Sequence, residues 1–473
     1  MSHDISKVES SQHESCSISN RDWTPSEEQR ARLKIDLSVL PLLVFGMIMF
    51  QLDRMNVASA LTGGFAADLG VNQDTINLGN QLMFLGIIVL EIPSNMLLQK
   101  IGPSKWIPAQ VFVFGLIATM QVFLKSRSGF LATRMLLGLA EAGYIPGSIY
   151  TLSTWYTPQE LGKRVAILFF GMFGGNAISP LLGAGILRLE GSGGLRGWQY
   201  IFLIEGIITM AVSALLLLVL PTSPQLPKPL FLSGLIRWTE REQHILTSRQ
   251  STENKPSDIK NRTGIPLEVV RKTVLNYRRW PHFLSTACVF STWSPLTTYT
   301  PSIIMSLGFT RIQANALSAI GASLTLPIVF LAAWASDKTK KRGLTVIAAI
   351  CCYLAVLIVA RAVLPKTPNA KWSRFGMWTV VNAFAVCYHP VHNVWVQLNC
   401  GSQAERRVMS AISGLLAGTQ IYRASDSPTY HTGLIIQIAL VAAGLVFAIF
   451  QEGIYLVLNS QARRRSSPVI WTP

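Results

Sequence analysis

The feature of this sequence that most limits its fold is a series of apolar segments, each long enough to cross a bilayer. Crossing ~30 Å of hydrocarbon takes about 20 apolar residues in a helix, and the backbone must satisfy its polar groups there internally. The segments are 36–60, 77–99, 106–124, 130–155, 164–187, 199–220, 281–305, 312–336, 344–363, 374–398, 408–422 and 433–458. The sequence therefore predicts an all-α membrane protein with twelve transmembrane helices.

The twelve segments form two groups of six, separated by a polar connector. Two six-helix pseudo-repeats joined by a linker are the plan of a parallel-repeat secondary transporter, in which one half rocks against the other. The first 35 residues are hydrophilic and lack the apolar region of a signal peptide. The predicted parts are a disordered cytosolic tail (1–35), an N-terminal bundle (36–220), a cytosolic linker (221–280), a C-terminal bundle (281–458) and a basic cytosolic tail (459–473).

Lysine and arginine predict the orientation of these helices. With a cytosolic N-terminus, 29 of the 41 basic residues fall in cytosolic segments and 10 in outer loops. This bias places both termini in the cytosol. The net charge of +17 is thus distributed between apolar spans, which argues against a nucleic-acid-binding surface.

Several function classes lack support in the sequence. The chain contains no GxxxxGK[ST], HExxH or GxSxG pattern, so ATP hydrolysis and the common hydrolytic reactions have no motif. The six cysteines form no CxxC or Cys/His metal spacing and read as buried apolar residues. We therefore expect no enzyme, no metal and no cofactor, with a proton gradient as the driving force.

The segment LDRMNVASA, residues 52–60, places Asp53 and Arg54 in the first span, with Asn56 nearby. A charged side chain at a helix centre costs about 2.5–3.5 kcal/mol on insertion scales, so these groups should face the bundle interior or water. Arg54 can grip a carboxylate bidentately, and Asp53 can bind and release a proton. The pair therefore suggests a proton-coupling site beside an anion-binding site; the alternative is an ion pair that only fixes helix packing.

Further charges lie in the second and fourth spans. Arg134 and Glu141 are seven residues apart in RMLLGLAEAGYIPG and so share one helix face. Glu141 is a second candidate for proton coupling, and Arg134 either binds substrate or neutralises a nearby acid. Glu91, close to Pro93, is better explained by packing at a kink.

The seventh and tenth spans carry prolines, aromatics and hydrogen-bonding groups, in TWSPLTTYTPSI and CYHPVHNVWVQLN. Broken helices that line a midplane cavity have such sequences. The candidate substrate contacts are Tyr299, His389, His392, Asn393 and Trp395. Packing is the competing explanation for each of them.

At these residues the chain resembles the major facilitator superfamily, and within it the anion:cation symporter family and its fungal allantoate-permease-like branch. The resemblance runs from about residue 36 to 458 and is carried by LDRMNVASAL, EIPSNMLLQKIGPSKWIPAQ, TRMLLGLAEAGYIPGSIY, GWQYIFLIEG and QIYRASDSPTY. It implies proton-coupled movement of a small organic anion, such as allantoate, nicotinate, pantothenate or biotin. It also implies that Arg54 binds the substrate carboxylate, that Asp53 and Glu141 couple protons, and that Arg134 supports them.

The superfamily's loop signature implies a cytosolic gate in each half. ASDKTKKRG matches it well, with Asp337 and Arg342 as gating residues, whereas Leu98 replaces the acidic residue in the first half. The fold usually works as a monomer, and we expect it in the plasma membrane.

Two features keep alternatives open. The fifth span contains GNAISPLLGA, close to the Gly-Pro signature of proton-driven exporters, so a metabolite exporter is the second hypothesis; Pro180 is more simply a kink. The eleventh span offers only about 15 residues, or ~22 Å of helix. That short span is the basis for a third hypothesis, a non-transporting or degenerate paralogue, and it could also reflect a faulty gene model.

Overall fold

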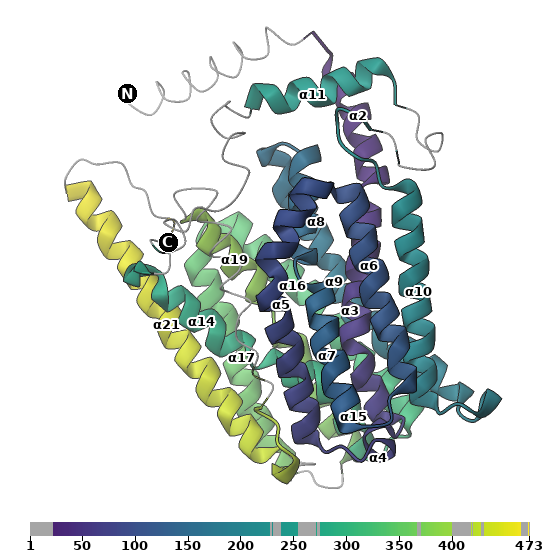
Figure 1. Cartoon of the computed structure of the whole chain (residues 1–473). Helices are drawn as coiled ribbons and strands as arrows, with labels where there is room; N and C mark the ends of the chain where they lie inside the picture. Colours follow the sequence, from purple (N-terminus) through teal and green to yellow (C-terminus); the bar gives the residue numbers. More distant parts are fainter. Residues whose placement is uncertain are drawn as a thin grey trace.

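The computed structural model of the chain describes residues 22–227, 238–253, 275–366, 370–399, 420–426 and 430–464, with the single positions 229, 271, 418 and 472 (Figure 1). The regular structure of these residues is helical, apart from an isolated bridge between Pro221 and Pro229. The predicted all-α class is confirmed.

The N-terminal bundle is formed by helices α3 to α10. Their bounds are α3 (Leu40–Thr62), α4 (Phe65–Asp68), α5 (Gln73–Ile101), α6 (Pro103–Met120), α7 (Arg127–Glu141), α8 (Tyr144–Trp155), α9 (Pro158–Ile186) and α10 (Gly197–Val219). Helix α3 packs against both α9 and α10, and α5 packs against α7.

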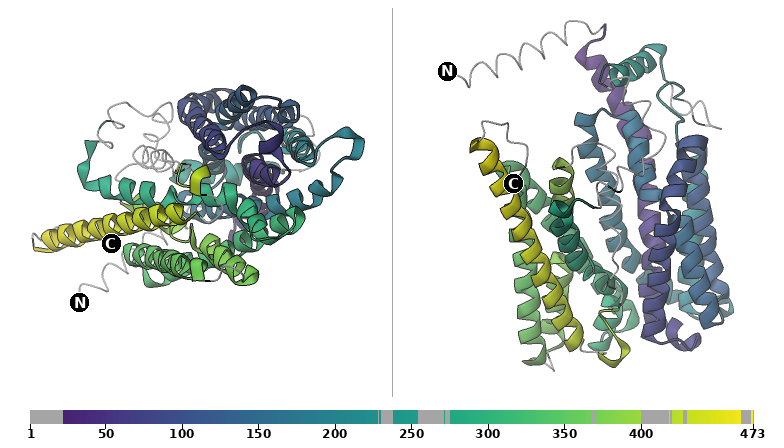
Figure 2. Two further views of the ribbon diagram at one scale, coloured as in Figure 1. Left: turned by 90° about the horizontal axis from the view of Figure 1, so that it is seen from below. Right: turned by 60° about the vertical axis from the view of Figure 1, so that its left-hand side comes forward.

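The C-terminal bundle is formed by helices α14 to α21. Their bounds are α14 (Trp280–Phe290), α15 (Trp293–Ser306), α16 (Arg311–Thr339), α17 (Arg342–Val363), α18 (Lys371–Phe384), α19 (His389–Leu398) and α21 (His431–Arg464). Viewed along the helix axes, the two bundles lie beside each other (Figure 2). Helices α15 and α16 of this bundle pack against α3 and α9 of the other.

Eleven of the twelve predicted spans have a helical counterpart in the described residues. Eight helical stretches are long and apolar enough to cross a membrane by themselves. Three further spans each consist of two consecutive helices, namely α7 with α8, α14 with α15, and α18 with α19. The eleventh span, residues 408–422, lies outside the described residues except for 418 and 420–422, so its predicted shortness is not addressed.

Two of the three broken spans have a local cause in their sequence. Gly143 takes a left-handed φ of 82° between α7 and α8, a conformation that costs glycine little. Ser291 and Thr292, between α14 and α15, donate their hydroxyls to the carbonyls of Cys288 and Val289 and so compete with helical hydrogen bonds. The sequence predicted breaks in the seventh and tenth spans, but the break in the fourth was not predicted.

The predicted disordered tail is wrong for residues 25–35, which belong to helix α2 (Pro25–Ser38). Thr24 and Glu27 form a capping box that starts this helix. Arg32 then pairs with Glu160 of α9 at 3.1 Å. The local cap and this long-range ion pair together order the segment.

Part of the connector also forms a helix, α11 (Glu240–Glu253), which lies beside α2 (Figure 1). Lys34 pairs with Glu242 at 2.6 Å, and Arg249 pairs with Glu28 at 3.1 Å and with Glu160 at 2.5 Å. Partial burial alone raises the pKa of Glu242, but hydrogen bonds from Lys34 and Thr239 outweigh it and leave this pKa below its usual value. Ion pairs therefore hold α11 on the N-terminal bundle.

Two glycines allow α5 and α7 to approach closely. A Cβ on Gly138 would lie 1.9 Å from the carbonyl oxygen of Met83, and one on Gly86 would lie 2.8 Å from that of Met135. The neighbouring atoms are backbone, so a larger side chain cannot be accommodated by rotamer changes. This contact fixes the position of α7 and hence of its charged residues.

We expect Gly138→Ala to destabilise the protein by about 1–3 kcal/mol, the usual cost of overpacking a filled interior. The matched control is Gly453→Ala in α21, where an added Cβ meets nothing within 4 Å. Thermal unfolding in detergent, followed by the loss of monodisperse protein, measures the difference. Equal melting temperatures for the two variants would show that the α5–α7 contact is not tight.

Candidate functional site

The charges predicted to act together converge between α3, α7 and α10. Nε of Arg54 on α3 donates to Oε2 of Glu141 on α7 at 2.7 Å, with side-chain exposures of 16% and 0%. The Arg54 guanidinium also lies 4.2 Å from the ring centroid of Phe50. A partly desolvated ion pair on an aromatic face is strong as long as both partners stay charged.

The break after α7 explains why Glu141 is available at this place. Glu141 is the last residue of α7, and the amide of Gln110 donates to the carbonyl of the next residue, Ala142. Tyr144 then starts α8 and donates its hydroxyl to the Leu43 carbonyl of α3 at 3.2 Å. The chain just after Glu141 is thus bonded to α6 through Ala142 and to α3 through Tyr144.

Asp53 lies next to this ion pair and forms no direct ion pair among the described residues. It is 0% exposed, and neither carboxylate oxygen has a hydrogen-bond partner among the described residues. The nearby Thr209 hydroxyl donates instead to the carbonyl of Glu205 at 3.0 Å. The charges of Glu141 and Arg134 act on Asp53. A buried carboxyl in this position can hold a proton.

Arg134 and Asn56 are buried in the same interior. Arg134 is 0% exposed; its Nη1 contacts the sulfur of Met83 at 3.8 Å, and Nε and Nη2 have no partner among the described residues. Asn56 is also 0% exposed, and both of its amide atoms lack such a partner. Both side chains therefore lie in the bundle interior in this conformation, and neither lines the cavity described below.

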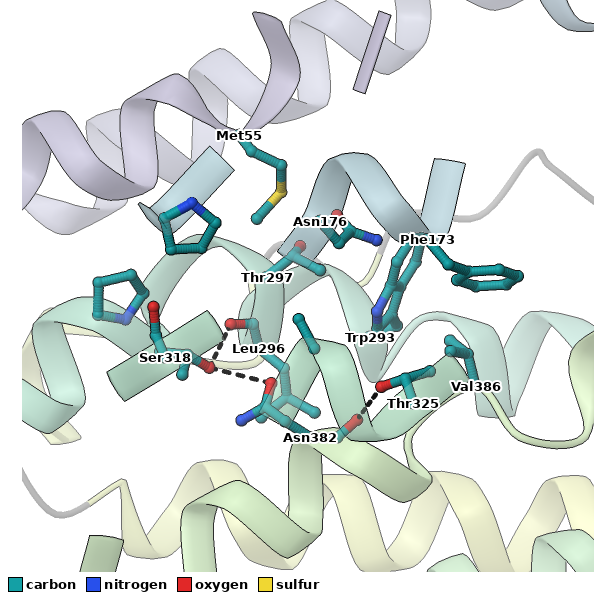
Figure 3. A pocket seen from close by; sticks show the side chains of 14 residues that line it. Met55, Phe173, Asn176, Trp293, Leu296, Thr297, Ser318, Thr325, Asn382 and Val386 are labelled. Atoms are coloured by element: carbon teal, nitrogen blue, oxygen red, sulfur yellow. Dashed lines mark hydrogen bonds between the residues drawn. The ribbon is translucent and has the colours of Figure 1, made fainter. Parts of the chain in front are cut away.

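A cavity lies between the two bundles (Figure 3). Met55, the residue after Arg54, lines it together with Asn176 and Phe173 of α9, opposite Trp293 of α15 and Asn382 of α18. The space open to the centres of water molecules is about 40 Å³, enough for about three waters. In this conformation the cavity is therefore too small for an organic acid.

The polar groups of this cavity are uncharged. Asn176 accepts a hydrogen bond from the Gln51 amide at 2.7 Å, and Thr300 donates to Oδ1 of Asn382 at 3.1 Å (Figure 3). Thr297, Ser318 and Thr325 supply further hydroxyls. Such a lining can bind hydroxyl or amide groups of a ligand. Arg54 is not among the lining residues, but it directly precedes one of them, Met55, on α3.

Hydrogen bonds between the bundles gather at one end of the molecule, here called the α4 side. Oδ1 of Asn77 on α5 accepts from the Tyr299 hydroxyl of α15 at 2.6 Å, and its Nδ2 donates to the Tyr422 carbonyl at 2.8 Å. Nδ2 of Asn315 on α16 donates to the Thr62 hydroxyl of α3 at 2.6 Å. These contacts close the α4 side. The predicted substrate contact Tyr299 is a member of this closure and does not line the cavity.

Loss of the Asn77 contacts should loosen the α4 side. Each hydrogen bond contributes about 0.5–1.5 kcal/mol net, so Asn77→Ala should shift the equilibrium toward opening by about 5- to 150-fold. Spin labels at the exposed positions Lys125 and Lys366, in a background without exposed native cysteines, report the separation of the bundles there. Asn95→Ala is the control, because Asn95 donates only within its own helix. An unchanged distance distribution would show that the Asn77 hydrogen bonds do not help to close the α4 side.

His392 and Trp395 pack inside the C-terminal bundle and not against the cavity. Nε2 of His392 lies 3.1 Å from Nδ1 of His282, whose Nε2 lies 2.9 Å from the Tyr455 hydroxyl. The Trp395 indole packs edge-on against His282 and donates to the Thr472 carbonyl. The rings of these two predicted substrate contacts therefore pack against His282 within the bundle, and the structure shows no contact between them and the cavity.

His389 and Asn393 form a pair on α19, with Nδ2 of Asn393 3.1 Å from Nε2 of His389. The His389 ring stacks on Phe290 at a centroid distance of 4.4 Å. Neither residue lines the cavity. The structure thus gives no contact between this pair and the predicted substrate site.

The two residues predicted to gate the second half form an ion pair. Nη1 of Arg342 pairs with Asp337 at 2.5 Å and donates to the Ser336 hydroxyl at 2.8 Å. In the first half, Leu98 is 1% exposed and packs in the apolar core. That core position explains how a leucine can stand where the signature has an acid.

This two-bundle architecture agrees with the comparison to a known protein family. The sequence model of the Major Facilitator Superfamily matches residues 43–420. The chain belongs to this superfamily. It is therefore a multi-pass integral membrane transporter and not an enzyme, as predicted.

Individual relatives agree with this assignment. The chain is 30% identical over 453 residues to an uncharacterized transporter of Saccharomyces cerevisiae, covering 94% of this chain and 83% of that protein. It is 28% identical over 347 residues to a putative tartrate transporter of Agrobacterium vitis, covering 71% and 73%. A solved bacterial homologue of the human lysosomal transporter Spinster, inward-facing and unoccupied, has a TM-score of 0.66 at 16% identity and covers 92% and 98%.

Sequence reasoning missed several residues of the site. Asn176 and Asn382 lack any pattern that distinguishes them from packing residues. Glu205 is different, because it stands within GWQYIFLIEG and interrupts an apolar span. Its charge was the available signal, and it was not used.

Proposed function

We propose that this transporter is a proton-coupled symporter of a small organic anion that works by alternating access. The observation that carries the proposal is the buried pair of Arg54 and Glu141, 2.7 Å apart, beside the unpaired carboxyl of Asp53. A fixed cation bound to an internal carboxylate can exchange that carboxylate for a substrate carboxylate. The adjacent acids can take up the protons that make the exchange possible.

The coupling follows from competition for Arg54. While Glu141 is ionised, it occupies the guanidinium and blocks an incoming anion. Protonation of Glu141 removes its charge and weakens the ion pair, so the substrate carboxylate can form a charge-assisted bond in its place. Release of the proton on the other side restores the pair and expels the substrate. Substrate and proton therefore move together.

The cavity beside Arg54 supports a substrate with an anionic end and a polar, uncharged body. Amide and hydroxyl groups line it, including Asn176, Asn382 and Thr297. Hydroxy acids such as tartrate and ureido acids such as allantoate have this composition. The similarity to a putative tartrate transporter supports this class, and we assign the chain to the anion:cation symporter family and its allantoate-permease-like branch on the same grounds.

The proposed orientation of the protein in the membrane rests on the distribution of its basic residues. The positive-inside bias places the side of α2 and α11 in the cytosol and the closed α4 side outside. The described conformation is then closed to the exterior. We place the protein in the plasma membrane as a monomer that uses the proton gradient and no cofactor.

The test is accumulation of labelled tartrate, allantoate, nicotinate, pantothenate and biotin by yeast cells that express the protein at their surface. Accumulation should rise as the medium is acidified, because external protons load Glu141, and an uncoupler should abolish it. Uptake that ignores the uncoupler would contradict proton coupling. Lower retention of a preloaded compound, without uptake, would instead support the exporter.

A further inference from the structure

A third buried carboxyl lies close to the proton-coupling residues. Glu205 of α10 is 2% exposed, and both of its carboxylate oxygens lack a hydrogen-bond partner among the described residues. Buried polar groups in native proteins are almost always hydrogen-bonded, and one without a partner calls for an explanation. A structural role would place donors around Glu205, which is not what the structure shows.

The surroundings of Glu205 point toward Asp53. Asp53 is the charged group that acts on Glu205, and the two residues lie on the packed helices α10 and α3. Thr209, one turn further along α10, is close to Asp53 and donates to the backbone carbonyl of Glu205. On the other sides, the parts of α6 and α9 in the bundle interior, residues 106–120 and 166–186, contain no charged residue. Glu205 thus has no cation of its own.

Charge balance in this interior requires a proton. The cluster contains the guanidiniums of Arg54 and Arg134 and the carboxyls of Asp53, Glu141 and Glu205. Arg54 pairs with Glu141, and Arg134 acts on Glu141 and Asp53. Two cations can balance two carboxylates, and an isolated third carboxylate in a dry interior is so costly that the group takes up a proton instead. Glu205, the carboxyl without a cation, is the one to hold it.

We propose that Glu205 is a third proton-carrying carboxyl of this transporter, which stores a proton beside Asp53 and passes it to the coupling site. In the transfer, the O–H bond of the Glu205 carboxylic acid breaks and a new O–H bond forms on the Asp53 carboxylate. Glu205 becomes a carboxylate and Asp53 an acid, so the charge of the cluster is conserved. The transfer rests on the proposed proton symport, whereas the protonated state of Glu205 does not.

The proton on Glu205 has a role in the proposed transport cycle. When a substrate carboxylate takes Arg54 from Glu141, the interior gains one negative charge and needs one more proton to stay neutral. That proton has to come from solvent; the transfer from Glu205 to Asp53 leaves the total charge unchanged, brings a proton next to Glu141 and leaves Glu205 as the carboxylate that is reloaded. Replacement of Glu205 should therefore slow the steps that move protons and spare the binding of substrate.

The first experiment needs no substrate. Purified full-length protein in lipid vesicles is measured by infrared spectroscopy at pH 7, and the spectrum of Glu205→Gln is subtracted from that of the wild type. We expect the difference to contain the carbonyl band of a protonated carboxylic acid. A difference that contains carboxylate bands instead would overturn the proposal, whether or not the protein is a symporter.

The second experiment uses the same vesicles and labelled tartrate, or whichever acid of the panel is accumulated. Glu205→Gln should lower proton-driven uptake at least about tenfold, the factor that corresponds to one pKa unit, and leave substrate exchange without a proton gradient near wild type. Glu205→Asp, which keeps a carboxyl group, should restore uptake. The control is Glu91→Gln, which removes a carboxyl of α5 outside the cluster and should leave uptake unchanged. An equal loss of uptake and exchange would show that Glu205 is merely structural.

Discussion

Arg54→Ala is expected to abolish transport of the organic anion. The guanidinium is the cation that a substrate carboxylate can reach beside the cavity, and loss of one partner of a buried charged pair costs about 2–5 kcal/mol. This corresponds to a fall in substrate affinity of roughly 30-fold to several thousandfold. Binding of the labelled acid to purified protein and its uptake into vesicles measure the two effects separately.

Arg54→Lys separates the role of charge from that of geometry. Lysine keeps the charge but lacks the planar fork that binds a carboxylate bidentately, so an intermediate loss is expected. The control is Arg188→Ala, because Arg188 is exposed on the surface. Transport by Arg54→Ala within twofold of the wild type, in folded protein, would remove Arg54 from substrate binding.

Asp53→Asn and Glu141→Gln are expected to uncouple substrate movement from the proton gradient. Each pH unit across the membrane can drive about tenfold accumulation per coupled proton, and a variant that no longer carries the proton should only equilibrate its substrate. Uptake by the wild type rises as external pH falls, because protonation loads the carboxyls, whereas uptake by these variants should lose this dependence.

Exchange of labelled for unlabelled substrate distinguishes uncoupling from misfolding. Both variants should keep this exchange, and Glu141→Gln should bind substrate at least as well as the wild type because it no longer competes for Arg54. Asp74→Asn, the same substitution at an exposed position of α5, is the control for Asp53→Asn. Uncoupler-sensitive accumulation at the wild-type level in Asp53→Asn would exclude Asp53 from coupling.

The sequence predicted the spans well because membrane insertion is a local requirement. A run of apolar residues such as 344–363 must be helical in a bilayer whatever its neighbours do, and α17 (Arg342–Val363) agrees. The end of the tail was misplaced, since the order of α2 depends on the pair between Arg32 and Glu160. These two residues are 128 positions apart, beyond the reach of local patterns.

The site also has features that local sequence predicts and features that depend on long-range contacts. Asp53, Arg54, Arg134 and Glu141 could be selected from the sequence because a charge inside an apolar span is costly and so marks an interior position. The surroundings of His392 and Trp395 could not be predicted in the same way, because an aromatic ring on a helix gives the same pattern whether it faces a cavity or another helix. Their contacts with His282 exist only in the assembled bundle.

The sequence by itself thus determined the number of helices, their division into two groups and the identity of the buried charges, because the bilayer sorts residues by polarity one segment at a time. The tertiary structure decided which charges meet. It pairs Arg54 with Glu141, leaves the carboxylates of Asp53 and Glu205 without a hydrogen-bond partner among the described residues, and assigns Tyr299 to the closed α4 side. Such pairings depend on the rotation and depth of helices far apart in the chain, which are set by contacts such as Gly138 against Met83.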